Sequence, residues 1–247
     1  MKRTSLPSWW PLLALGTVFL ALEIFGLDRR IAQALYYDAG TGAWLGSGTG
    51  DWWAHRLLHD GGRWVVRSVA ALALLTWACS FAWPGLRPHR RDAGFVALAM
   101  IASVAVVGGL KAITHVDCPW DLVGFGGHNP YVPLFAHRWN YLPHAACFPG
   151  AHSSSGFALM CFYFVWRDRS ARLARWGLLA GLLVGCAFAV GQEARGAHFL
   201  SHDIASAAIV WLVQLLLYAS LLRPASEIDS RQAVRGHAGG QAADNVS

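Results

Sequence analysis

The stretch Arg195-Gly196-Ala197-His198-Phe199-Leu200-Ser201-His202-Asp203 places an arginine, two histidines and an acid between two apolar runs. Ionisable side chains are costly to bury at membrane depth, so at that depth they are functional candidates. On these nine residues alone, a polar connector that lies in water between two spans explains the pattern equally well. Two further polar clusters favour the functional interpretation.

The composition is that of an integral membrane protein. Of 247 residues, 55% are hydrophobic and 14% are charged, and the mean hydropathy is +0.37. Several of the 13 tryptophans flank apolar runs, as in an interfacial aromatic belt. The net charge of +6 would suit nucleic acid, but the arginines form short clusters between apolar runs. We therefore interpret them as topology signals and predict no nucleic-acid partner.

The apolar runs predict an all-α, polytopic membrane bundle with about six transmembrane helices. We place the spans at residues 7–27, 64–83, 94–110, 153–166, 176–190 and 204–222. The first is expected to be retained, because no small-x-small cleavage site precedes Asp28. Residues 1–222 then form one membrane domain, with the catalytic motifs within 111–203, and the polar tail 223–247 is predicted to be disordered.

Charge asymmetry predicts that both termini are cytoplasmic. Arginine clusters at 87–91 and 167–175 fall on the same side as Lys2, Arg3 and Arg223. The connection 28–63 obeys the rule less well and is assigned no chemistry. In this topology Lys111, the segment 149–152 and the opening stretch all emerge on the opposite face. We therefore expect a multi-pass inner (cytoplasmic) membrane protein whose active site faces the periplasm or outside.

Three polar segments far apart in the sequence are thus expected to meet at the outer ends of four spans. They supply cations for an anionic substrate, histidines that can attack or protonate, and an acid that can orient an imidazole. These are the parts for phosphoryl transfer through a phosphohistidine, with no metal and no other cofactor. The inventory is Lys111, His152, Arg195, His198, His202 and Asp203.

The same segments resemble the type 2 phosphatidic acid phosphatases, a family related to the vanadium haloperoxidases. That family carries Lys-x6-Arg-Pro, Pro-Ser-Gly-His and Ser-Arg-x5-His-x3-Asp. This chain has Lys111-x6-Cys118-Pro119, then Pro149-Gly150-Ala151-His152, then Gly191-Gln192-x5-His198 with Asp203 beyond it. Motif order, spacing and the six apolar runs support the resemblance over residues 94–222.

The resemblance implies a role for each matching residue. His198 is the expected nucleophile and His152 the general acid that protonates the leaving oxygen. Lys111 is expected to bind the phosphate, together with the backbone amides of Gly150 and Ala151 at a helix N-terminus. Water then hydrolyses the phosphohistidine.

The chain departs from the family pattern at two arginines, which are replaced by Cys118 and Gln192. Arg195 lies one helical turn from Gln192 and is expected to supply a substitute guanidinium.

The position of the family's acid falls on His202, with Asp203 one residue later. We expect Asp203 to orient His198, because a carboxylate also stabilises an imidazolium; His202 is the alternative. His202 and Ser153 are accessory candidates.

Two other functions remain open. His198 and His202 have the i, i+4 spacing of zinc ligands, which His115, Asp117 or Asp203 could complete into a metal-dependent membrane hydrolase. Against it, Phe199 stands where the zincin pattern has glutamate. A non-enzymatic transporter or assembly protein is the other alternative.

The long polar connection 111–148, called the outer loop below, gives a second set of expectations. His115, His128, His137 and His144 are expected to be loop residues, and Asp117 and Asp121 either shape the loop or orient Lys111. Cys118 and Cys147 both lie in this loop, which faces an oxidising compartment in the predicted topology, so we predict a disulfide between them. The other three cysteines lie within predicted spans.

The resemblance implies a lipid phosphate or diphosphate in the bilayer as substrate. Phosphatidic acid, phosphatidylglycerol phosphate, undecaprenyl diphosphate and lipid A phosphates all fit, and the sequence decides neither among them nor the oligomeric state.

Overall fold

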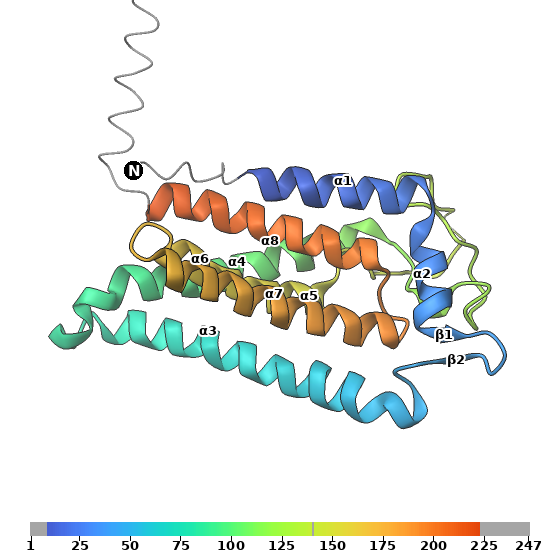
Figure 1. The fold of residues 1–247 in the computed structure, drawn as a ribbon, viewed down its shortest axis with the longest axis horizontal. Coiled ribbons are helices and arrows are strands. Elements are labelled where there is room, and N and C mark those ends of the chain that lie inside the picture. The colour runs from blue at the N-terminus through green and yellow to red at the C-terminus, as the bar shows by residue number, and fades with distance from the viewer. Residues whose placement is uncertain (1–8, 140, 223–247) are drawn as a thin grey trace, which may run out of the picture.

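Each of the six apolar runs folds into helix in the computed structural model, which describes residues 9–139 and 141–222 (Figure 1). The predominantly helical class predicted from the sequence is therefore confirmed. The α-helices are α1 (Trp10–Ile24), α2 (Leu27–Leu35), α3 (Gly62–Cys79), α4 (Arg90–Thr114), α5 (Ala151–Phe157), α6 (Cys161–Trp166), α7 (Ala171–Ala194) and α8 (Leu200–Leu221). A short 3-10 turn, η5 (Ala158–Met160), joins α5 to α6 across the fourth run.

The connection 28–63 is more structured than its composition suggests. It contains α2, then a hairpin of β1 (Tyr37–Asp38) and β2 (Ala43–Trp44) with Tyr37 opposite Trp44. The 3-10 turn η1 (Gly48–Gly50) and the π-helix η2 (Trp52–Gly61) follow, and η2 runs directly into α3. Two further 3-10 turns are η3 (Pro84–His89) and η4 (Pro119–Asp121).

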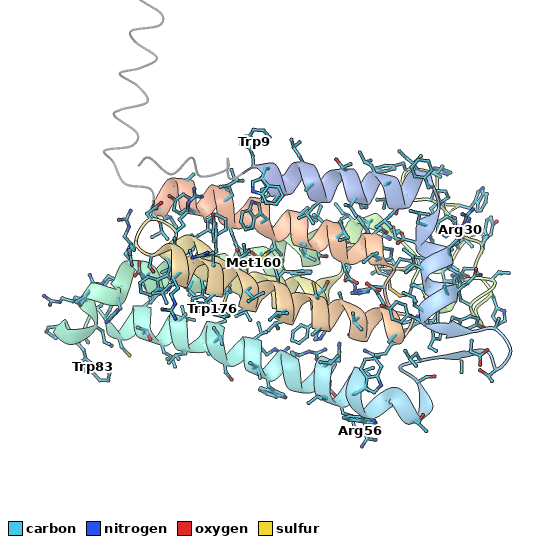
Figure 2. All side chains as sticks on the ribbon, in the orientation of Figure 1. Trp9, Arg30, Arg56, Trp83, Met160 and Trp176 are labelled. Atoms are coloured by element: carbon cyan, nitrogen blue, oxygen red, sulfur yellow. A yellow bond between two sulfur atoms is a disulfide. The ribbon has the colours of Figure 1, made fainter. Side chains whose placement is uncertain are left out.

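The bundle buries one main apolar core between its long helices. α1 packs on α8, α3 on α4, and α5 and α6 on α7, with α4 also against α8. Phe95, Phe157, Phe164 and Trp211 fill this core, and Met160 points into it in Figure 2. Gly185 permits the close packing of α5 on α7, because a Cβ there would lie 2.1 Å from the Phe157 ring.

The outward faces of the helices carry large apolar side chains, as a lipid-facing surface requires. Leu72 on α3, Leu183 on α7 and Leu216 on α8 are each at least 60% exposed. By length and composition, three segments of the described chain can cross a membrane: Pro84–Asp121, Ala171–Ala194 and Leu200–Leu221. α1 and α2, bent by 84° at their junction, qualify together as a fourth. The six-span count therefore stays a prediction.

The two ends of the bundle differ in character (Figure 1). At the left end lie the α3–α4 turn, the α6–α7 connection and the end of α8; Arg169 there pairs with Asp92 at 2.5 Å and 2.7 Å. At the right end lie α2, the hairpin, the long connection between α4 and α5, and the α7–α8 turn. The arginine clusters and the polar motifs thus occupy opposite ends. Which end is cytoplasmic stays a prediction, and Lys2, Arg3, Arg223 and the tail 223–247 lie outside the described residues.

Candidate active site

His198 in the turn between α7 and α8 and Asp203 in the first turn of α8 form a buried pair. His198 Nδ1 lies 2.9 Å from Asp203 Oδ1, and the two side chains are 4% and 2% exposed. The Ser153 hydroxyl on α5 donates to the same carboxylate oxygen at 2.5 Å. With Nδ1 held by the carboxylate, Nε2 is the ring nitrogen that is left for a substrate.

Gly150 allows this pair to lie against the start of α5. A Cβ at position 150 would be 2.3 Å from Asp203 Oδ1 and 2.8 Å from His198 Nδ1, closer than real Cβ atoms approach. The Gly150 amide donates to the His202 carbonyl at 3.2 Å, and its own carbonyl accepts from Ser206 Oγ at 2.9 Å. The Gly150 N–H thus already has a protein acceptor in this structure, and its expected role in phosphate binding stays a prediction. Ala151 lines the cavity described below, and a role for its amide stays a prediction.

His202 is buried behind His198 and makes no contact with its Nδ1. Its ring packs edge-on against Phe148 and Phe199, and its own Nδ1 has no hydrogen-bond partner within residues 9–139 and 141–222. Of the two side chains that the spacing left open, Asp203 is the one that hydrogen-bonds to His198 Nδ1, whereas the His202 ring lies beside the His198 ring with centroids 6.0 Å apart. α8 begins at Leu200, so His198 precedes the helix and does not share a helical face with His202. The i, i+4 argument for a zinc pair therefore fails.

A cavity of about 850 Å³ opens beside His198. The three predicted polar segments all contribute to its wall, with Lys111 from the last turn of α4, His152 from α5, and Arg195 from the end of α7. The remainder of the wall is largely apolar and comes chiefly from α3, α4, η5 and the connection between α4 and α5. It includes Val66, Ala70, Met100, Ile101, Val104 and Ala158.

The cations and burial keep His198 neutral. Burial lowers the pKa of His198 to about 3, and the positive charges of Lys111 and Arg195 act in the same direction. An imidazole with an unprotonated Nε2 at neutral pH is able to act as a nucleophile. The same two cations line the cavity together with His198.

His152 lines the cavity from a different side. Its ring stacks on Phe188 with centroids 4.4 Å apart, and its Nε2 lies 3.2 Å from the Leu58 carbonyl oxygen. The carbonyl can only accept, so Nε2 carries a hydrogen there and Nδ1 is the nitrogen through which a second proton would be exchanged.

Sequence reasoning missed two cavity residues, His59 on η2 and Arg63 on α3. An Arg63 Nη2 contacts His59 Nε2, and His59 Nδ1 lies 2.8 Å from Gln192 Nε2. Gln192 Oε1 in turn accepts from Arg195 Nη1 at 3.3 Å. Arg67, one turn beyond Arg63, also lines the cavity. The sequence signal that could have indicated this part of the site is the pair Arg63 and Arg67, spaced i, i+4 at the start of an apolar run.

The described residues contain one group with metal-ligand geometry, His55, His59 and Asp60, whose ligand atoms lie within 4.8 Å of one another. It includes neither His198 nor His202. Both ring nitrogens of His59 already face other side chains, Arg63 and Gln192, and the guanidinium would repel a cation.

The outer loop is tied down by covalent and ionic contacts. Cys118 and Cys147 form the predicted disulfide, with Cα atoms 5.1 Å apart. Buried Asp117 pairs with Arg138 at 2.9 Å and accepts from Asn129 at 2.7 Å, so it shapes the loop. Cys79, Cys161 and Cys186 are free thiols.

A comparison with protein families matches residues 92–224 to the PAP2 superfamily. The chain belongs to the PAP2 superfamily. No curated protein and no solved structure matches it. The superfamily indicates a phosphatase-type hydrolase, and the apolar helices fit its membrane-associated members. The matched region contains Lys111, His152, His198 and Asp203. It begins after η2 and α3, so the PAP2 match says nothing of His59 or Arg63.

Proposed function

We propose that this PAP2 protein is a metal-independent phosphatase that removes phosphate from a lipid phosphate or diphosphate through a phosphohistidine at His198. The observation that carries the proposal is the buried His198–Asp203 contact of 2.9 Å beside a cavity that also holds Lys111 and Arg195. Nucleophile, orienting acid and phosphate-binding cations are thus present together.

The reaction begins when His198 Nε2 attacks phosphorus and the bond to the bridging oxygen breaks. Lys111 and Arg195 neutralise the phosphoryl oxygens, with the planar Arg195 guanidinium suited to bidentate contact. Asp203 holds the Nδ1 proton and balances the positive charge that develops on the ring. His152 gives a proton to the departing oxygen, and water then attacks the phosphohistidine to release phosphate.

A lipid substrate suits the shape and chemistry of the cavity. Its polar wall lies at the end of the bundle that carries the motifs. Its apolar wall extends from there along α3 and α4 toward the middle of the bundle. A substrate with a charged head and an apolar tail matches both walls. We place the site at the outer face of an inner membrane, in line with the charge asymmetry of the sequence.

Phosphate release from a panel of lipid phosphates by detergent-purified protein tests the activity, with one assay series in EDTA. We expect turnover of at least one lipid, persistence in EDTA, and loss of about a thousandfold or more in His198→Ala. Quenching with alkali should trap an acid-labile phosphoryl group on His198. Loss of activity in EDTA with rescue by zinc would overturn the histidine mechanism.

A further inference from the structure

The cavity holds more positive charge than a single phosphate group requires. Lys111 and Arg195 suffice to balance a phosphate monoester dianion, yet Arg63 and Arg67 line the same space from α3. Arg63 forms no ion pair with a carboxylate anywhere in the described ranges 9–139 and 141–222. Arg67 is directed toward the Trp64 ring, with 5.8 Å from its guanidinium carbon to the centroid. Neither arginine is thus paired with a carboxylate in these ranges, and Arg63 is the one that contacts a second cavity residue, His59.

Arg63 contacts His59, whose ring is the neighbour of the proposed leaving-group acid His152. Lys111 and Arg195 perturb the pKa of His198, whereas Arg63 and Arg195 both perturb that of His59, which is lowered to about 4 chiefly by burial. The His59 ring lies 4.4 Å from the His152 ring, between Arg63 and the proposed proton donor. A group bound at Arg63 would thus lie on the side of the cavity that His59 and His152 line.

The hydrogen bonds around His59 have too many donors. Arg63 must donate to His59 Nε2, so a neutral ring then carries its hydrogen on Nδ1 and needs an acceptor from Gln192. Arg195, however, also needs the Gln192 oxygen, and the amide has just one. Whichever tautomer the His59 ring adopts in this orientation, and whichever way the Gln192 amide is turned, one link in the series Arg63–His59–Gln192–Arg195 joins two donors. An anion would supply the missing acceptor and release the conflict.

From these contacts we propose that Arg63, positioned by His59, forms a second anion subsite on the leaving-group side, and that this subsite selects lipid diphosphates over lipid monophosphates. The inference rests on the proposed phosphatase function and assigns the terminal phosphate to Lys111 and Arg195. The inner phosphate, attached to the lipid, is assigned to Arg63.

The step balances without a further reactant. The bond from His198 Nε2 to the terminal phosphorus forms as the bond from that phosphorus to the bridging oxygen breaks. The bridging oxygen keeps the electron pair, takes the proton from His152, and leaves as part of the lipid monophosphate, whose remaining charge Arg63 neutralises. Water then converts the phosphohistidine to inorganic phosphate and free His198.

Farnesyl diphosphate and farnesyl monophosphate test the subsite, because the two substrates share one tail. For Arg63→Gln we expect the ratio of kcat/KM for diphosphate to that for monophosphate to fall about 10- to 100-fold, as for loss of hydrogen bonds to a charged group. Arg56→Gln is the matched control, since Arg56 lies on η2 with its side chain 80% exposed and points away from the bundle (Figure 2). It should leave the ratio unchanged. Equal losses on both substrates in Arg63→Gln, or no loss on the diphosphate, would overturn the proposal.

A binding measurement separates failure of the subsite from failure of the phosphatase function. Methylenediphosphonate and methylphosphonate cannot be hydrolysed at their P–C bonds, so calorimetry on the purified protein reports binding alone. We expect the diphosphonate to bind at least about tenfold more tightly, and Arg63→Gln to remove most of that preference. Equal affinities in the native protein would overturn the subsite even if hydrolysis were found. Conversely, a preserved preference with no turnover of any lipid would overturn the proposed function alone.

Discussion

Replacing Asp203 with asparagine tests the proposed mechanism at its most buried contact. Asp203 Oδ1 accepts from both His198 Nδ1 and Ser153 Oγ, and the carboxyl also interacts with the buried carboxyl of Glu193. An asparagine oxygen can occupy the Oδ1 position and accept the same two hydrogens. The substitution therefore keeps the His198 tautomer and removes chiefly the negative charge.

The expected loss follows from the charge that is removed. A carboxylate about 4 Å from an imidazolium contributes about 4 kcal/mol at an effective dielectric constant of about 20. The ring acquires only part of its charge in the transition state, so we expect the phosphorylation rate to fall about 30- to 1000-fold. Asp203→Ala also frees the imidazole to rotate and should lose more. We therefore expect the phosphorylation rate of Asp203→Ala to be lower than that of Asp203→Asn, and the rate of Asp203→Asn to be well below that of the native protein.

Rapid-quench measurement of labelled phosphoenzyme formation isolates this step from the later attack of water. Thermal unfolding in detergent checks that each variant is folded. His202→Gln is the informative comparison, because His202 occupies the position four residues after His198 but does not contact its Nδ1. If His202→Gln lost about a hundredfold or more while Asp203→Asn lost less than about threefold, Asp203 would not be the orienting acid.

Three further predictions concern the surroundings of the pair. Arg195→Lys should lose nearly as much kcat/KM as Arg195→Ala if the guanidinium binds phosphate bidentately; near-native activity in the lysine variant would show that its shape is not needed. Gly150→Ala should lower kcat about a hundredfold by displacing the pair, since its Cβ would overlap Asp203, whereas Gly109→Ala on α4, with open space around it, should not. Cys118→Ser should destabilise the protein by up to about 3–4 kcal/mol, measured by unfolding with and without reductant; an equal midpoint in both proteins would contradict a stabilising disulfide.

The lengths of the apolar runs predicted most of the helices, and the motif spacing predicted most of the residues that line the site. The runs became helices because a backbone surrounded by lipid must satisfy its own hydrogen bonds. Lys111, His152 and His198 came together because Lys111 lies in the last turn of α4, His152 in the first turn of α5 and His198 just before α8, all at the same end of the bundle. The role of Gly150 was not predictable, since the neighbours that its missing Cβ makes room for come from a helix some 50 residues further along the chain.

The connection 28–63 resisted prediction because its structure depends on distant partners. Trp44 stacks on Phe125 at 5.5 Å, and Gly196 at φ +75° leaves room for the Trp44 ring, so the hairpin is held by the outer loop and the α7–α8 turn. η2 lies against α7, where Gly191 approaches Leu58. Local sequence contains neither contact. His59 and Arg63 reach the cavity only through this packing.

The two departures from the family's motif arginines each change what the motif position contacts. Position 118 is now a half-cystine that ties the start of the outer loop to Cys147, just before the turn that holds Gly150. Position 192 is now a glutamine whose side chain reaches His59, and through it Arg63, on elements outside the matched PAP2 region. An arginine at either position would carry a positive charge there. Here Cys118 gives a covalent tie instead, and Gln192 gives a contact through His59 on η2 with the cation Arg63 on α3. If Arg63 binds a second phosphate, the lost motif charge has been moved toward the leaving group, and the change of residues becomes a change of substrate preference.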